Sequence, residues 1–164
     1  MTSSDATPAA NRPGGTLHHP AGFLTRKVIN PFAVALSRRG ISVRGSLMIE
    51  VAGRKSGEPR QTVVNLVELD GVRYVVAQRG VTQWVRNLRA AEGACALVLG
   101  RQRDEYAAEE ITGTPQTVPV LRKTLAEWGF EVSQFFPKDI DKSSSDAELQ
   151  AIAGDYPVFR LTPG

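Results

Sequence analysis

The sequence predicts a mainly β (α+β) fold, a single domain built as a six-stranded antiparallel β-barrel with short flanking helices. Six short segments rich in β-branched and apolar residues follow one another along the chain. Turn signals such as Asp70-Gly71 separate them, and the helical patterns between them are short. Because strands joined by hairpins pair in antiparallel fashion, this order favours a small barrel over a parallel sheet of βαβ units.

The N-terminal part of the chain differs in composition from the rest. Residues 1–20 are rich in Ala, Pro, Gly, Ser and Thr and predict a disordered tail, which leaves residues 21–164 for the barrel domain. Residues 23–39 show the spacing of an amphipathic helix that ends at Gly40, although Pro31 also allows two short helices. The apolar stripe of this segment faces either the core or a membrane surface, and both readings stay open.

The first three strands are predicted from alternation and turn chemistry. Residues 46–51 form the first, and a polar loop with two glycines over 52–59 leads to the second at 61–68. Asp70-Gly71 is a strong hairpin turn and leads to a third strand over 72–77.

The middle of the chain predicts one short helix and two more strands. Thr82 is expected to cap a helix that runs through Arg89. Strands over 94–99 and 104–112 follow, joined near Gly100. Because the second of these alternates only weakly, we expect it at an edge of the sheet.

The last part of the chain predicts two helices and a final strand. Apolar residues spaced three and four apart indicate a helix over 117–128, with Gly129 as its stop signal. Ser145 and Glu148 have the spacing of a capping box and predict the start of the second helix. Residues 156–161 form the sixth strand.

The composition excludes several kinds of chemistry. Cys95, the one cysteine, lies in an apolar run and is predicted to be a buried small residue rather than a catalytic thiol. The only histidines, His18 and His19, lie in the predicted tail, so neither a metal centre nor a histidine-based catalytic system is expected. No run is apolar enough for a bilayer span or a secretory signal, which predicts a cytoplasmic protein, with peripheral contact to the inner face of the plasma membrane through 23–39 as the alternative.

Charge is unevenly distributed. Residues 21–60 contain eight basic and two acidic side chains, whereas residues 131–155 contain six acids and two lysines. The basic part suggests an anionic partner: a phosphorylated cofactor or an anionic lipid surface, with a solvated charged face as the plain alternative. Nucleic acid is not expected as a partner because exposed aromatic residues are not interleaved with the basic ones.

Two segments are candidates for ligand binding. The loop over 53–62 combines two glycines with three cations and two hydroxyl groups, a set that suits phosphate or carboxylate but matches neither a P-loop nor a Rossmann fingerprint. In the segment over 77–89, a strand runs through Gly80 into a helix start, where backbone N–H groups suit an anion. Trp84 in that segment packs either on a planar ligand or on the core.

Four motifs occur in order: Gly-Arg-Lys-Ser-Gly-x-Pro-Arg-x-Thr from Gly53, Asp-Gly-x-x-Tyr-Val-Val-Ala from Asp70, Trp-x-x-Asn-Leu-Arg from Trp84 and Pro-Val-Phe-x-Leu from Pro157. Together they resemble the deazaflavin (coenzyme F-420)-dependent nitroreductase family of split β-barrel oxidoreductases, over residues 23–161. The resemblance implies an enzyme that passes a hydride from reduced coenzyme F-420 to an electron-poor small molecule such as a nitroaromatic compound, a quinone or an enone.

The resemblance also implies site residues. For the phosphate and the acidic tail of the cofactor it implies Lys55 and Arg60, with Arg54 and Ser56 nearby. It implies that Thr62, Val63 and Val64 pass the edge of the ring. It further implies that Gln78, Arg79 and Gly80 complete the phosphate pocket and that Trp84 and Asn87 brace that wall. Arg79 stands where many relatives carry a lysine. The substrate wall, expected at Trp128, Phe135 and Phe136, departs from the tyrosine-bearing wall of the best-known relatives.

Other readings stay open beside this one. The chain could be a related barrel that binds FMN or haem, or a non-enzymatic carrier of a small molecule or lipid. No acid–base pair stands out, so no catalytic residue is assigned. Two copies are expected to pair through sheet faces, as small split barrels often do.

Overall fold

The structure is a computed structural model that describes residues 46–164. The predicted tail over 1–20 and the predicted helix over 23–39, with its membrane contact, lie outside the described residues and stay predictions. The pairing of two copies likewise stays a prediction. Within residues 46–164, no helix has the length and apolar character needed to cross a membrane.

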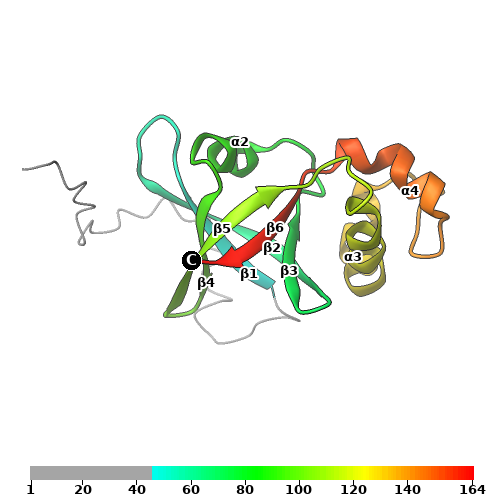
Figure 1. The fold of residues 1–164 in the computed structure, drawn as a ribbon, viewed down its shortest axis with the longest axis horizontal. Helices are drawn as coiled ribbons and strands as arrows, with labels where there is room; N and C mark the ends of the chain where they lie inside the picture. Colours follow the sequence, from blue (N-terminus) through cyan, green and yellow to red (C-terminus); the bar gives the residue numbers. More distant parts are fainter. Residues whose placement is uncertain (1–45) are drawn as a thin grey trace, which may run out of the picture.

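Six antiparallel strands close into a barrel, which confirms the predicted fold (Figure 1). Their order around the barrel is β1-β2-β3-β6-β5-β4. The strands are β1 (Ser46–Ala52), β2 (Pro59–Leu69), β3 (Val72–Val76), β4 (Ala94–Leu99), β5 (Gln102–Glu110) and β6 (Val158–Pro163). The helices are α2 (Gln83–Ala90), α3 (Thr117–Val132) and α4 (Asp146–Ile152), with short 3-10 turns η1 (Ser133–Phe135) and η2 (Ala153–Asp155).

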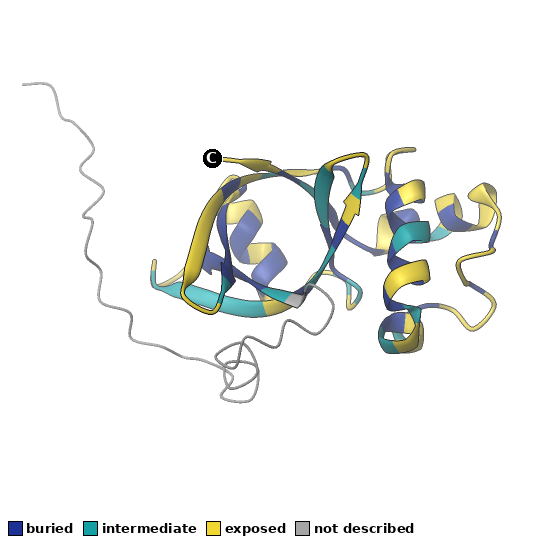
Figure 2. Cartoon of the chain, turned by 90° about the horizontal axis from the view of Figure 1, so that it is seen from below, coloured by how far each residue is buried: buried dark blue, intermediate teal, exposed yellow. Residues whose placement is uncertain are grey.

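The barrel interior is one of the two larger apolar cores among the described residues. Alternate residues of the strands point inward, among them Ile49, Leu97 and Phe159, because side chains on a strand alternate between its two faces. Helix α2 adds Val85 and Leu88, both fully buried, to the same core. Figure 2 looks into the barrel and shows α2 lying across it. The helix therefore has a fixed position relative to the strands.

The second core lies between the barrel wall and the helices α3 and α4, which stand together to one side of the barrel (Figure 1). Val67 and Val76 come from the strands, and Leu121 and Leu149 come from the two helices. Trp128 fills this core and donates from its indole N–H to the carbonyl of Leu66 at 3.2 Å. This hydrogen bond joins α3 to β2.

Local turn and cap signals are confirmed. Asp70 and Gly71 have φ values of 53° and 76°, the left-handed conformation that a tight hairpin between β2 and β3 requires. The Ser145 hydroxyl accepts from the Glu148 N–H, and the Glu148 carboxylate accepts from the Ser145 N–H, which completes the capping box of α4.

Three local predictions are wrong. The strand over 104–112 was expected at an edge, but β5 pairs with β4 on one side and with β6 on the other, since the C-terminal strand closes the barrel. Gly129 does not stop α3, which continues to Val132 because that side chain is buried in the helical core. Thr82 precedes α2, but its side chain makes no capping hydrogen bond.

Candidate functional site

The basic loop, residues 53–58 between β1 and β2, is held by its own backbone. The Gly53 N–H donates to the Glu58 carbonyl at 2.8 Å, and the Gly57 N–H donates to the Gly53 carbonyl at 2.7 Å. Gly57 has a φ of 71°, a conformation that favours glycine. The Ser56 hydroxyl accepts from the Glu58 N–H at 3.2 Å. These contacts give the loop a defined shape at the mouth of a cavity.

Hydrogen bonds fasten this loop to α2. Arg54 donates from Nη1 to the side-chain oxygens of Asn87 at 2.9 Å and Gln83 at 2.8 Å. The backbone N–H of Arg54 also donates to Asn87 Oδ1 at 3.3 Å. Asn87 is only 7% exposed, so these donors satisfy a buried carbonyl group. Arg54, predicted near the cofactor phosphate, therefore positions the loop.

Between the basic loop and α2 lies a cavity of about 420 Å³. Its lining residues are Gly53, Arg54, Lys55, Ser56, Arg60, Gln61, Thr62, Gln83, Trp84 and Asn87. No ion pair of Lys55 or Arg60 occurs within residues 46–164. Two unneutralised cations beside hydroxyl groups suit a phosphate or carboxylate.

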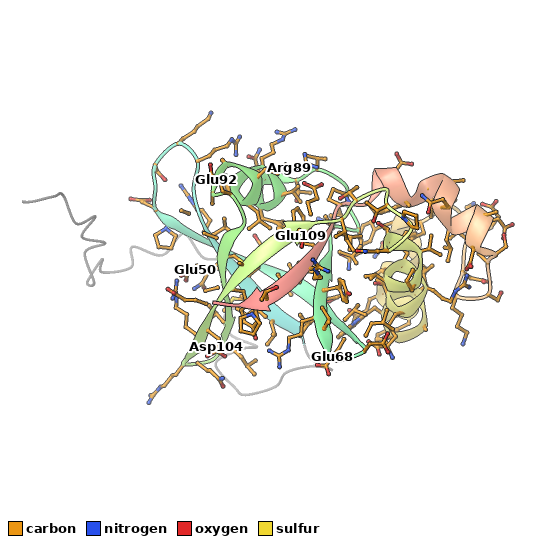
Figure 3. The ribbon with its side chains drawn as sticks, in the orientation of Figure 1. Glu50, Glu68, Arg89, Glu92, Asp104 and Glu109 are labelled. Carbon is orange, nitrogen blue, oxygen red and sulfur yellow. The ribbon has the colours of Figure 1, made fainter. Side chains whose placement is uncertain are left out.

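Two acidic side chains of the barrel, by contrast, have close basic partners. Glu50 accepts from Arg103 at 2.8 Å, and Glu110 accepts from Arg89 at 2.7 Å. The hydrogen bond from Arg89 holds the pKa of Glu110 below its usual value. Figure 3 shows that Glu50, Glu68, Asp104 and Glu109 are spread over the barrel. The charges of Glu50 and Glu110 thus have partners nearby, whereas Lys55 and Arg60 have none in the part of the chain that the structure describes.

A second cavity, of about 370 Å³, continues from the first and shares Thr62, Gln83 and Trp84 with it. It is also lined by Val63, Val64, Val76, Ala77, Gln78, Arg79, Thr82 and Phe135. Trp84 is 9% exposed and lies 5.7 Å from the Phe159 ring, measured between centroids. The reading of Trp84 as a core residue is confirmed. Because the indole also lines the cavity, its packing on a planar ligand stays a prediction.

A third cavity, of about 510 Å³, is lined by Gln78, Arg79, Gly80, Phe135, Asp155 and Tyr156. It shares Gln78, Arg79 and Phe135 with the second. The Arg79 guanidinium lies 4.9 Å from the centre of the Phe135 ring, within the range of a cation–π contact. Because neighbouring cavities share walls, the three form one groove, which runs from the basic loop past Trp84 to Phe135.

The structure brings the predicted cofactor residues together. All twelve line one or more cavities of the groove. Of the three residues predicted to form the substrate wall, only Phe135 lines any of these cavities. Trp128 is 2% exposed in the helical core, and Phe136 is buried and stacks on Tyr156 at 4.3 Å. The geometry therefore does not support these two side chains as a substrate wall.

Gln83 and Thr82 are among the residues that line the groove without having been predicted as ligand residues. Gln83 is four residues before Asn87, and that helical spacing places both on the face of α2 that meets the basic loop. Thr82 was assigned only as a cap, whereas it lines the second cavity. The four-residue spacing of Gln83 and Asn87 indicates in the sequence that Gln83 lies on the same face of the helix. The place of Thr82 in the cavity wall depends on the tertiary fold and has no such signal.

Cys95 lies apart from this groove. It is buried in the barrel core, and burial raises the pKa of its thiol to about 11. Because the thiolate is the reactive form, the thiol is unreactive near neutral pH. The prediction of a structural cysteine is confirmed.

Comparison with known proteins identifies one family. The family model described as F420H(2)-dependent quinone reductase matches residues 29–134. No curated protein sequence matches the chain.

Several solved structures are similar to this chain at low sequence identity, and two of those that follow have TM-scores above 0.5. A structure described as a domain-swapped dimer is 16% identical, with 80% of this chain and 95% of that chain covered and a TM-score of 0.53. The haem storage protein HutZ from Vibrio cholerae is 13% identical, with 82% and 89% covered and a TM-score of 0.52. An F420-H2 dependent reductase is 18% identical, with 73% and 95% covered and a TM-score of 0.49.

Proposed function

This chain belongs to the F420H(2)-dependent quinone reductase family, and we propose that it passes a hydride from reduced coenzyme F-420 to a quinone, a nitroaromatic compound or an enone. The family makes the chain an F-420-dependent reductase with a small-molecule acceptor. The observation that carries the proposal is the groove, which has Lys55 and Arg60, without an ion pair among the described residues, at one end and aromatic side chains along the rest.

The residues of the groove fit this cofactor. Coenzyme F-420 combines a planar deazaflavin ring with a phosphate and an acidic tail. Lys55 and Arg60 would hold the anionic groups, because their charges are not neutralised by described acidic residues. Trp84 would form a wall for the ring, and Thr62 to Val64 would follow the ring edge.

When bound, reduced F-420 supplies the hydride, and the chain supplies binding and orientation. Asp155 is the one carboxylate among the described residues that line the groove. The neighbouring Tyr156 hydroxyl donates to the Phe135 carbonyl at 2.8 Å, and burial raises its pKa. Tyr156 therefore holds its proton in a structural hydrogen bond. We assign no side-chain proton donor and propose water for that role.

The acceptor would enter at the Phe135 end of the groove. Phe135 offers an aromatic surface there, and Arg79 lies over the same ring. An electron-poor planar molecule fits such a surface through stacking. FMN binding, haem binding and passive carriage are not favoured, since the matched family is one of F-420-dependent reductases.

The test is a turnover assay with reduced F-420 and the quinone menadione. Oxidation of F-420 is followed by the return of its visible absorbance, and reactions without enzyme and without quinone serve as controls. We expect oxidation that depends on both enzyme and acceptor. If the protein binds F-420 but does not catalyse its oxidation by any quinone, nitroaromatic compound or enone, it is a carrier, and the proposal is contradicted.

A further inference from the structure

Two buried polar atoms in the described part of the chain have no hydrogen-bond partner: Nε2 of Gln78 and Oγ1 of Thr82. Such atoms are uncommon, because a buried donor without a partner destabilises the folded state. The two residues are close in sequence, and both line the second cavity of the groove together with Trp84 and Phe135. Their coincidence at one cavity indicates a ligand that satisfies them.

Backbone groups near these two side chains already form hydrogen bonds with one another. The turn that carries them is closed by a hydrogen bond from the Gly80 N–H to the Ala77 carbonyl at 2.9 Å. A second bond at 2.9 Å runs from the Thr82 N–H to the Gly80 carbonyl. Thr82 stands at the position before α2 where a threonine commonly caps a helix, yet its hydroxyl makes no cap. The hydroxyl is therefore available to another group.

We propose that Gln78 and Thr82 form a neutral hydrogen-bonding subsite for a carbonyl oxygen of a planar molecule bound beside Trp84. The inference rests on the proposed function and deepens it. An amide N–H and a hydroxyl are neutral donors, which match a carbonyl better than a phosphate. Lys55 and Arg60, which form no ion pair within residues 46–164, line the adjoining cavity. Arg79 also lines the second cavity, but its guanidinium lies 4.9 Å from the centre of the Phe135 ring. Gln78, expected from the resemblance at the phosphate, is thus assigned to a neutral group.

Two molecules of the reaction carry such an oxygen. One is the deazaflavin ring, which has ring carbonyls, and the other is the acceptor, where it is a quinone or an enone. The chemistry of recognition is the same for both, so experiments must separate the sources.

The first experiment measures the melting temperature of the ligand-free protein. Thr82→Val removes the hydroxyl and keeps the shape, so we expect the melting temperature to rise by about 2–4 °C, since it eliminates an unsatisfied buried group. Thr117→Val is the matched control, because the fully buried Thr117 hydroxyl donates to the Ile111 carbonyl at 2.6 Å. That variant should melt at a lower temperature. A lower melting temperature for Thr82→Val as well would overturn the inference.

The second experiment measures F-420 affinity and the KM for menadione in the wild-type protein and in Thr82→Val, Gln78→Met and Thr82→Ser. Loss of one neutral hydrogen bond should weaken binding by about three- to tenfold, and Thr82→Ser should retain it. If the source is the ring, titration with oxidised F-420 alone shows the loss. If the source is the acceptor, F-420 binds normally and the KM for menadione rises by that factor.

Failure of the subsite and failure of the proposed function give different results. Wild-type protein that neither binds F-420 nor reduces menadione would overturn the proposed function and the subsite with it. Wild-type protein that does both, with Thr82→Val and Gln78→Met unchanged in F-420 affinity and in KM, would overturn the subsite alone.

Discussion

Asn87 accepts two hydrogen bonds from Arg54, one from the guanidinium at 2.9 Å and one from the backbone N–H at 3.3 Å. The two residues are 33 positions apart, in α2 and in the basic loop. A buried amide oxygen thus connects the helix that packs in the barrel core to the loop that carries Lys55. We infer that the position of the cationic end of the groove depends on this pair.

Replacing Asn87 should loosen the basic loop. Asn87→Ala leaves the donors of Arg54 without their part-buried acceptor, and we expect a loss of about 1–2 kcal/mol in the free energy of unfolding. F-420 affinity should fall as well, although Asn87 carries no charge. Urea denaturation and cofactor titration measure the two effects. Gln83→Ala, which removes only an exposed hydrogen bond, is the control for stability, and an equal loss of unfolding free energy in both variants would contradict this role.

Lys55→Ala and Arg60→Ala should each weaken F-420 binding by about tenfold or more. Charge-assisted hydrogen bonds are worth roughly 1.5–3 kcal/mol when well placed, and about 1.4 kcal/mol corresponds to a factor of ten. Stability should change by only about 0.5 kcal/mol, as expected for surface loop residues. Fluorescence titration at low and high salt checks affinity and screening. Lys138→Ala is the control, and unchanged affinity in both loop variants would move the cofactor site elsewhere.

Gly93 and Gly129 should respond in opposite directions to alanine. A Cβ atom at Gly93 would lie 2.1 Å from the Ala108 carbonyl oxygen, and its φ is 85°, so we expect Gly93→Ala to cost about 3 kcal/mol or more. A Cβ atom at Gly129, inside α3, meets nothing within 4 Å. Gly129→Ala should therefore add about 0.5–1 kcal/mol of stability. Thermal unfolding measures both, and a tolerated Gly93→Ala would contradict the close approach of β4 and β5.

Because the Cys95 thiol is buried, we expect the protein to lose stability at alkaline pH. Burial raises the pKa of its thiol from 9.0 to about 11, so the unfolded chain releases this proton first. The stabilising contribution of the neutral thiol is complete below pH 9 and is lost as the pH rises from 9 to about 11. Urea denaturation across this range should show a steeper fall for wild type than for Cys95→Ala. Parallel curves would show that the thiol does not titrate in this way.

Local signals predicted much of this fold, and long-range pairing explains the errors. Asp70-Gly71 and the Ser145–Glu148 box work because their chemistry is complete within a few residues. The edge assignment of β5 was wrong because β6, some fifty residues later, pairs with it. Gly129 does not end α3, because the burial of Val132 outweighs the weak helix preference of one glycine.

The candidate site follows the same pattern. Resemblance and loop composition located the lining residues, because glycines and cations of one loop are visible in the sequence. The positioning role of Arg54 was not visible, since it depends on where α2 packs. Trp128 and Phe136 could not be assigned to a core or a groove from their apolar character alone, which suits both.

The central claim is that the groove holds coenzyme F-420 through its cationic end. Titration of the wild-type protein with oxidised F-420 and with FMN, side by side and followed by tryptophan fluorescence, tests it most directly. Trp84 lines the groove and should report the bound ring. The account predicts F-420 binding at least about tenfold tighter than FMN, with the difference reduced in Lys55→Ala and Arg60→Ala. Equal or tighter binding of FMN would contradict it.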